Sequence, residues 1–276
     1  MSLSTYNFIW KLLEFILPSY LERRKNNGKE DIHRIHERYG ISKKNRPSGT
    51  LVWLHGTSIG ESVAALALAN SMRKNGYGNK DNEYFLLTTN TLSAAKLIKD
   101  KIKKGLPAIH QYHPYDHPKF VSKFLNHWQP NMAVFLESDF WPNLIYLTTQ
   151  TKIPTILASS QMSEKSARFW SGIGILLAKK IFGNVNQVLA VDPKQADLFK
   201  RLGAKNIKSL TSLKSIAEKP IINQNYIYNI KKNLVKKKIL LAASTHPGEE
   251  ELMIKLANLL RQNAKDKILI IIAPRH

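Results

Sequence analysis

Short apolar runs alternate with stretches of helical periodicity along most of the chain. The runs have strand length and few polar residues, as strands buried on both faces do; they cover 51–55, 83–89, 108–113, 131–137, 154–160 and 187–191. The stretches between them place apolar residues three and four positions apart, as amphipathic helices do; they cover 61–74, 91–104, 118–128, 164–181 and 194–204. Strands that alternate with helices predict an α/β fold with a parallel, doubly wound sheet.

The same pattern restarts near the end of the chain. A Lys- and Asn-rich stretch, 219–236, is expected to be a linker. The pattern of 237–276 then predicts a strand, a helix and a second strand. One such unit leaves sheet edges and an apolar face uncovered. We therefore expect 25–218 to form a Rossmann-like domain and 237–276 to be the start of a truncated second domain.

The N-terminal segment 1–24 carries an apolar stretch that is too short to cross a membrane. FIWKLLEFIL (8–17) is interrupted by Lys11 and Glu14 and is closed by Pro18, whereas a spanning helix needs about 20 apolar residues. The stretch is not a secretory signal and precedes basic residues, so we expect a helix that lies on an anionic membrane surface. The alternative is an amphipathic helix packed on its own domain.

Charge and cysteine content narrow the possible functions. The chain has 42 Lys and Arg residues against 20 Asp and Glu, a formal net charge of +22. This excess suggests a polyanionic partner such as a phosphorylated substrate, a membrane or nucleic acid; the alternative is a basic surface without a specific partner. The chain has no cysteine, which excludes disulfides, cysteine-bound zinc and thiol catalysis.

Polar residues gather where the predicted strands end. In open α/β sheets, ligands bind beyond the carboxyl ends of the strands. The polar clusters at these ends are His55, Ser58 and Glu61, then Thr88, Thr89 and Thr91, and the segments 137–143, 159–166, 244–250 and 274–276. Clusters that converge on one edge of a sheet predict a binding crevice.

Each cluster also has a purely structural explanation. Glu61 in the first turn of a helix is favoured by the helix dipole by about 0.3–1 kcal/mol. Trp141 and His246 suit helix starts, and the threonines suit strand-end packing. The chain lacks phosphate-loop, zinc-protease and serine-hydrolase signatures. HQYH (110–113) and HPYDH (113–117) show no convincing metal-ligand spacing and are expected to be loop residues.

The motifs taken together are more specific than any one of them. In order they are RPSGTLVWLHGTSIGE (46–61), LLTTNT (86–91), ESDFWPN (137–143), ILASSQMSEKS (156–166), RLGA (201–204), LK (213–214), AASTHPGEE (242–250) and APRH (273–276). This series resembles the 3-deoxy-D-manno-octulosonic acid (Kdo) transferases of lipopolysaccharide synthesis along essentially the whole chain.

The resemblance implies a GT-B fold of two Rossmann-like domains and a defined reaction. Members move Kdo from CMP-Kdo to a phosphorylated lipid A precursor, lipid IVA, at the cytoplasmic face of the inner membrane. The N-terminal domain holds the acceptor and the C-terminal domain holds CMP. No metal or other cofactor is expected, and no nucleic acid partner.

The resemblance also implies roles for individual residues. Glu61 matches the general base of an inverting transfer, for which one carboxylate faces the attacked centre opposite the leaving group. Glu137 and Lys214 match transition-state stabilisers, and a cation such as Lys214 offsets charge on the leaving phosphate. The residues expected to bind the acceptor are Ser58, Gly60, Thr89, Trp141, Asn143 and Ser163. The residues expected to bind CMP are Ser244, Thr245, His246, Glu249, Pro274, Arg275 and His276.

The chain departs from the family pattern in two short segments, and the sequence leaves alternatives to an active transferase open. Ser159, Ser160 and Gln161 replace an Asn-Ala-Arg triplet, and Thr211-Ser212 replaces Gly-Asn. The remaining CMP-binding loops are expected beyond residue 276. The alternatives to an active transferase are a remnant that only binds lipid, one half of a split enzyme, and a basic protein that binds a polyanion.

Overall fold

The chain forms two compact units, which are described separately. The computed structural model describes residues 1–78, 81–213, 224–234, 238–263 and 268–274. The first unit is Met1–Glu218 and the second is Lys219–His276.

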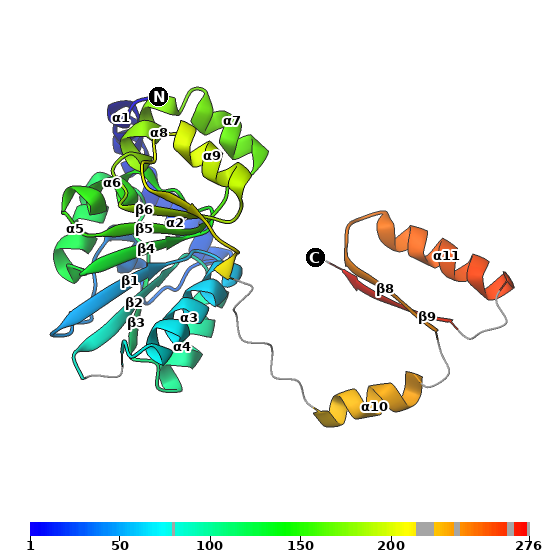
Figure 1. Cartoon of the computed structure of the whole chain (residues 1–276). Helices are drawn as coiled ribbons and strands as arrows, with labels where there is room; N and C mark the ends of the chain where they lie inside the picture. The colour runs from blue at the N-terminus through cyan, green and yellow to red at the C-terminus, as the bar shows by residue number, and fades with distance from the viewer. Residues whose placement is uncertain (79–80, 214–223, 235–237, 264–267, 275–276) are drawn as a thin grey trace. The chain divides into compact units, whose positions relative to one another are not determined.

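The first unit is built on a seven-stranded parallel sheet with the strand order β3-β2-β1-β4-β5-β6-β7 (Figure 1). Its strands are β1 Thr50–His55, β2 Glu83–Thr89, β3 Ala108–Tyr112, β4 Met132–Leu136, β5 Thr155–Ser160, β6 Gln187–Ala190 and β7 Ile207–Ser209. The chain builds outward from β1 to β3 and then returns to place β4 on the other side of β1. This reversal creates a topological switch point between β1 and β4.

Helices cover both faces of this sheet, which confirms the predicted doubly wound α/β fold. Helices α3 and α4 pack on one face, and α5, α6, α8 and α9 pack on the other. Their bounds are α3 Ile59–Lys74, α4 Leu92–Lys103, α5 Pro118–Trp128, α6 Pro142–Gln150, α7 Glu164–Ser171, α8 Ile175–Phe182 and α9 Pro193–Arg201.

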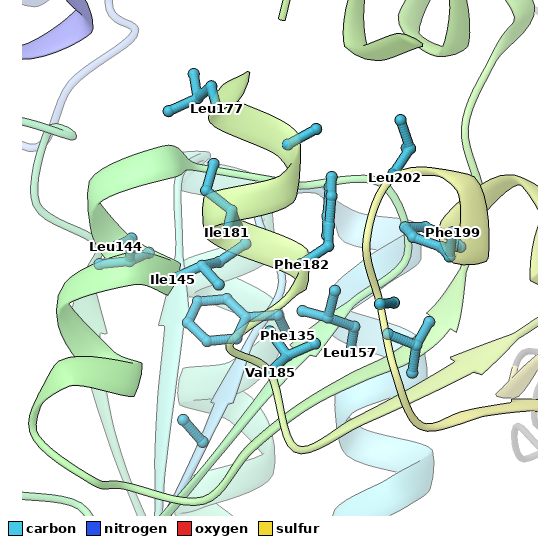
Figure 2. Packing of buried hydrophobic residues seen from close by; sticks show 14 of the residues in the cluster. Phe135, Leu144, Ile145, Leu157, Leu177, Ile181, Phe182, Val185, Phe199 and Leu202 are labelled. Carbon is cyan, nitrogen blue, oxygen red and sulfur yellow. The ribbon is translucent and has the colours of Figure 1, made fainter. Parts of the chain in front are cut away.

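Two cores result because successive strand residues point to opposite faces of the sheet. Val134 of β4 packs toward α3 and α4. Its neighbour Phe135 lies with Leu157 of β5 under Phe182 of α8 and Phe199 of α9 (Figure 2). The rings of Phe182 and Phe199 meet edge to face, with centroids 5.4 Å apart. Burying each such side chain contributes about 1.5–3 kcal/mol.

The structure differs from the predicted elements in three places. The helix expected over 164–181 is two helices, because the chain turns sharply between Ser171 and Ile175. A Cβ atom on Gly174 would lie 3.0 Å from the Phe169 carbonyl oxygen, so a larger residue in this turn would have to displace that backbone by a few tenths of an ångström. The short strand β7 was not predicted because its sequence, IKS, has one apolar residue. The segment expected to be a linker contains helix α10, Gln224–Leu234.

The N-terminal segment also forms two helices, α1 Leu3–Glu14 and α2 Leu17–Asn26. Pro18 does not close the first helix as expected; it lies in the first turn of α2, where a missing N–H costs nothing. None of the helices in the described part of the chain combines the length and apolar character that crossing a membrane requires.

One side of α1 packs on the first unit. Leu3 is buried in its core, and Trp10 has ring contacts with Tyr115 and His117. The opposite side exposes Phe8 and Leu12. The helix therefore packs on its own domain, as one of the two interpretations expected, and keeps an outward apolar stripe.

The second unit contains a parallel strand pair and one adjoining helix. Strands β8 Lys238–Thr245 and β9 Ile268–Pro274 pair in parallel, and α11 Glu249–Asn263 connects them. This confirms the predicted order of strand, helix and strand. Ile239 and Leu241 of β8 and Leu252 of α11 are exposed, so apolar side chains of this unit face solvent.

Candidate functional site

The polar clusters of the first unit meet at the switch point of its sheet. His55 at the end of β1 pairs in register with Phe135 of β4. The loop after β1 therefore lies beside the loop after β4, and the carboxyl groups of Glu61 and Asp139 lie close enough for each to shift the pKa of the other. This is the position at which open α/β sheets bind ligands.

Glu61 is held rigidly at the N-terminus of α3. Ser58 is the N-cap residue, and Glu61 completes a capping box with it. Oε2 of Glu61 accepts hydrogen bonds from the Thr57 and Ser58 amides, both at 2.7 Å, and from the Thr57 hydroxyl at 2.8 Å. The side chain is 6% exposed. The structural explanation for Glu61 is thus confirmed, and the same contacts orient the carboxylate at the switch point.

The carboxyl groups of Glu61 and Asp139 have pKa values that are shifted in opposite directions. Burial raises the pKa of Glu61, but hydrogen bonds from Ser58, Thr57 and Asp139 outweigh it and leave the pKa below its ordinary value. Burial and the charge of Glu61 raise the pKa of Asp139 to about 7. Glu61 is therefore ionised at neutral pH, whereas Asp139 gains or loses its proton near neutral pH. Pairs of carboxyl groups with separated pKa values are typical of acid–base sites.

Glu137 occupies a strained position directly after β4. Its φ of 60° lies in the left-handed region that few residues other than glycine adopt. The backbone is held there by hydrogen bonds to β5 and the loop after it, from the Glu137 amide to the Ala158 carbonyl and from the Gln161 amide to the Glu137 carbonyl. The side chain is buried. Such strain is concentrated at functional sites.

Several buried polar atoms of His55, His113 and the segment that starts α6 have no hydrogen-bond partner in the described part of the chain. They are Nε2 of His55, Nε2 of His113, Nε1 of Trp141 and Oδ1 of Asn143. The rings of His55 and His113 have centroids 5.3 Å apart, as do those of His113 and Trp141. Buried polar atoms are almost always hydrogen-bonded in the absence of a ligand. These four atoms could accept or donate hydrogen bonds if the site opens to a ligand or to water.

The two histidines of this cluster are neutral. Burial lowers the pKa of His55 to about 4, although the charge of Glu61 partly opposes it. Burial, His55 and Arg38 hold the pKa of His113 well below its ordinary value. Nδ1 of a neutral His113 donates to the Pro114 carbonyl at 2.7 Å, so its Nε2 is an acceptor.

Asp116 fixes the start of α6 and with it Trp141 and Asn143. Its carboxylate accepts from the Asn143 amide at 2.9 Å and the Leu144 amide at 2.7 Å. Tyr6 of α1 donates its hydroxyl to the same carboxylate at 2.8 Å. Burial raises the pKa of Asp116 to about 7, against the effect of these donors. HPYDH forms the loop between β3 and α5, as expected from the sequence, and its buried Asp116 supports the site.

The other residues expected to bind the acceptor have mainly structural contacts. Gly60 lies in the first turn of α3 beside Glu61. The buried Thr89 hydroxyl is hydrogen-bonded to Nε2 of His110 at 2.8 Å. Ser163 is the N-cap residue of α7 and accepts from the Ser166 amide. These contacts position the loops around the switch point, and direct acceptor binding by these residues stays a prediction.

The two departures from the family pattern contact each other. Ser159 lies in β5 with a φ of 56°. Its hydroxyl donates to Oγ of Ser212 at 3.2 Å and accepts from the Leu213 amide at 3.1 Å. Ser159 thereby anchors the segment that leads to Lys214. Lys214, which was expected to stabilise the transition state, lies outside the described residues.

The residues expected to bind CMP lie at the ends of β8 and β9 in the second unit. Ser244 has a φ of 60° at a bulge in β8, and Thr245 donates its hydroxyl to Glu250. The His246 amide donates to Oε2 of Glu249 at 2.7 Å at the start of α11. Pro274 ends β9. Arg275 and His276 lie outside the described residues.

The sequence analysis missed Asp139, His113 and Asp116 as parts of the site. Asp139 lies inside a motif that was recognised, but its raised pKa depends on Glu61 from another loop. His113 and Asp116 belong to a segment without a recognisable ligand spacing. Among the described residues, no group of three His, Asp or Glu side chains is arranged to hold a metal ion.

Comparison with known proteins identifies the family of the chain. Residues 33–217 match the family model described as 3-deoxy-D-manno-octulosonic-acid transferase (kdotransferase). The chain is 34% identical over 252 residues to the 3-deoxy-D-manno-octulosonic acid transferase of Rickettsia bellii, covering 90% of this chain and 57% of that protein.

A plant relative and a further bacterial relative show the same coverage. The chain is 32% identical to a probable mitochondrial 3-deoxy-D-manno-octulosonic acid transferase of Arabidopsis thaliana, over 95% of this chain and 58% of the relative. It is 26% identical to the 3-deoxy-D-manno-octulosonic acid transferase of Haemophilus influenzae, over 88% of this chain and 56% of that relative. The chain thus spans a little over half the length of these relatives. The chain belongs to the Kdo transferases, a family of glycosyltransferases.

Proposed function

We propose that the chain transfers Kdo from CMP-Kdo to a hydroxyl group of a phosphorylated lipid A precursor, lipid IVA, in lipopolysaccharide biosynthesis. The observation that carries the proposal is the buried, ionised Glu61 beside Asp139 at the switch point of the sheet. Family membership supports the choice of Kdo as the sugar that is moved.

In the proposed reaction, Glu61 is the general base of an inverting displacement. The acceptor oxygen forms a bond to the anomeric carbon of Kdo as the bond from that carbon to the CMP phosphate oxygen breaks. CMP leaves with the electron pair, and the hydroxyl proton passes to Glu61. A positioned base of this kind contributes about 10²–10⁴-fold to the rate. Its lowered pKa keeps Glu61 in the ionised form that accepts the proton.

The partnerless polar atoms are proposed to orient the acceptor sugar. Nε2 of His113 and Oδ1 of Asn143 are acceptors for sugar hydroxyl groups, and Nε1 of Trp141 is a donor. Because these atoms are buried, the side chains that cover them must move before the acceptor sugar can reach them.

The proposed donor site uses the candidate CMP-binding residues of the second unit. Glu137 and Lys214 are proposed to stabilise the transition state, and Arg275 is proposed to pair with the CMP phosphate, since a guanidinium binds phosphate in a bidentate manner. No metal is required, because cationic side chains offset the charge of the leaving phosphate.

We further propose that the protein acts at the cytoplasmic face of the inner membrane. The outward stripe of α1 exposes Phe8, Leu12 and Phe15, which are 60%, 57% and 87% exposed. Arg23, Arg24 and Lys25 end the neighbouring helix α2. An apolar helix face with nearby cations is typical of helices that lie in an anionic membrane surface.

Mass spectrometry of the lipid products tests the proposed function. The chain is incubated with CMP-Kdo and lipid IVA, and CMP-N-acetylneuraminate serves as the control donor. A mass increase of one or more Kdo units with CMP-Kdo alone supports the proposal. Absence of any Kdo-bearing lipid, with lipid IVA binding retained, contradicts transfer by this chain.

A further inference from the structure

A second candidate site lies beside the edge strand β3. A cavity of about 480 Å³ opens between α4, β3 and the segment before β1. Its apolar wall is formed by Leu92, Ala95 and Ile102. A cavity of this size accommodates a small organic ligand. None of its lining residues belongs to the group around Glu61.

Four cationic side chains converge on this cavity. They come from three parts of the chain: Arg34, Lys44, and Lys96 with Lys99 of α4; Asp31 is the one carboxylate in the lining. Arg34 is paired with Glu37 at 2.8 Å. Among the described residues, neither Lys96 nor Lys99 forms an ion pair with a carboxylate. The cavity therefore keeps an excess of positive charge.

Two of these cations are fixed in place by the edge strand. Nζ of Lys44 donates to the His110 carbonyl at 2.9 Å, and Nη2 of Arg34 donates to the same oxygen at 3.0 Å. Burial, Arg34 and Lys99 lower the pKa of Lys44, with Glu37 opposing them. Cations held this close repel each other, and a bound anion relieves that repulsion.

We propose that this cavity is a binding site for a phosphate monoester. Lys44, Lys96 and Lys99 contact the phosphate oxygens, and the apolar wall contacts the part of the ligand that carries the phosphate. A doubly charged phosphate matches several lysines better than a single carboxylate does. The site is additional to the transfer reaction proposed above and does not depend on it.

Paired charge variants of α4 test the site. Lys96→Gln with Lys99→Gln removes two cations from the cavity. Lys103→Gln with Lys104→Gln removes two exposed cations from the end of the same helix, outside the cavity. Both variants change the net charge equally, and neither removes a hydrogen bond of Arg34 or Lys44. Circular dichroism confirms that each variant is folded.

Two probes separate a soluble phosphate from a lipid headgroup. Calorimetry measures the binding of glycerol 3-phosphate. Vesicle flotation compares phosphatidylcholine vesicles that contain phosphatidic acid, a phosphate monoester, with vesicles of equal surface charge that contain phosphatidylglycerol, a diester.

The proposal expects the cavity variant to weaken binding of one of the two monoesters by about tenfold or more, and the control variant to leave it nearly unchanged. If the cavity variant binds glycerol 3-phosphate more weakly, the ligand is a soluble phosphate. If it binds only the phosphatidic acid vesicles more weakly, the ligand is a lipid headgroup. Failure of the wild-type chain to bind either monoester, or equal loss in both variants, overturns the proposal.

Discussion

At the scale of single residues, Glu61 combines a structural and a chemical property. The donors that complete the end of α3 also hold the carboxylate ionised and fixed in direction. Helix capping and general-base chemistry therefore do not compete for this side chain. Gln retains the capping geometry but cannot accept a proton, which makes Glu61→Gln the informative substitution.

Asp139 makes stability depend on pH in a predictable direction. Burial and Glu61 raise its pKa in the folded protein from 3.8 to about 7. Between these values the folded state binds more protons than the unfolded state. The stability that Asp139 contributes is thus fully present below about pH 4 and is lost as the pH rises through 7.

Asp139→Asn replaces this group by a permanently neutral one. The unfolding free energy of the variant relative to wild type is expected to rise by about 2–3 kcal/mol as the pH increases from 5 to 8. Urea denaturation at both pH values measures the difference. In a Glu61→Gln background the gain should shrink, because the neighbouring charge is gone. A gain that is equal at both pH values would contradict the assigned pairing.

Ser159 is predicted to order the segment before Lys214. Ser159→Ala removes the acceptor of the Leu213 amide, so hydrogen exchange of that amide should become about tenfold faster. Ser160→Ala is the matched control, because the Ser160 hydroxyl is buried without a partner in the described part of the chain. Unchanged exchange in Ser159→Ala, or equal acceleration in the control, would refute this role.

Single residues were predictable from the sequence where position alone fixes their role. Glu61 follows a glycine at the start of a helix after a buried strand, and that position places it at the sheet edge. Asp139 and His113 were not identified as functional because their properties arise from contacts between loops. The pKa of Asp139 depends on Glu61, and the unpaired Nε2 of His113 depends on burial.

At the scale of elements, α1 has two different faces. Tyr6 and Trp10 face the domain, whereas Phe8 and Leu12 face outward. The helix thus buries part of its apolar surface against the domain and leaves the rest exposed. The outward face is the part of α1 that the proposed membrane contact would use.

Charged substitutions on the outward stripe test this attachment. Leu12→Glu with Phe15→Glu should weaken binding to phosphatidylglycerol vesicles by at least about tenfold, because both apolar contacts and charge attraction are lost. Flotation measures the bound fraction. Ile32→Glu with Ile41→Glu, at two exposed positions outside α1, is the control. Equal binding of the stripe variant and the wild type would exclude α1 as the membrane contact.

Asp116 connects α1 to α6, and its removal should destabilise both. Asp116→Ala leaves the first amides of α6 and the Tyr6 hydroxyl without an acceptor, at a cost of about 2–4 kcal/mol. Tyr6→Phe removes one of these bonds and should cost about 1 kcal/mol. Chemical denaturation gives both values. In the Asp116→Ala background, Tyr6→Phe should cost nothing further, and full additivity would argue against the shared network.

Elements were predictable where their pattern is long and strongly apolar. The sheet strands from β1 to β6 are buried and apolar, and their runs locate them within one or two residues. β7 has three residues and one apolar side chain, which is too little for a pattern. The break between α7 and α8 depends on the close approach of Gly174 to Phe169, a contact that periodicity does not encode.

At the scale of the whole molecule, the first unit carries both the proposed acid–base site and a separate cavity lined by cations. The whole chain has a formal charge of +22, which favours anionic ligands. The order of the motifs along the chain predicted the family, and the sheet topology explains why motifs distant in sequence meet. What the sequence left open was their pairing, because strand order emerges only when β4 folds back beside β1.

The single-turnover rate of Kdo transfer in wild type and Glu61→Gln tests the central claim most directly. Saturating CMP-Kdo and lipid IVA remove binding from the measured rate, and denaturation checks that the variant stays folded. We predict a loss of about 10²–10⁴-fold in the rate, since Gln cannot accept the hydroxyl proton. A Glu61→Gln variant that transfers Kdo as fast as the wild type would show that the base lies elsewhere.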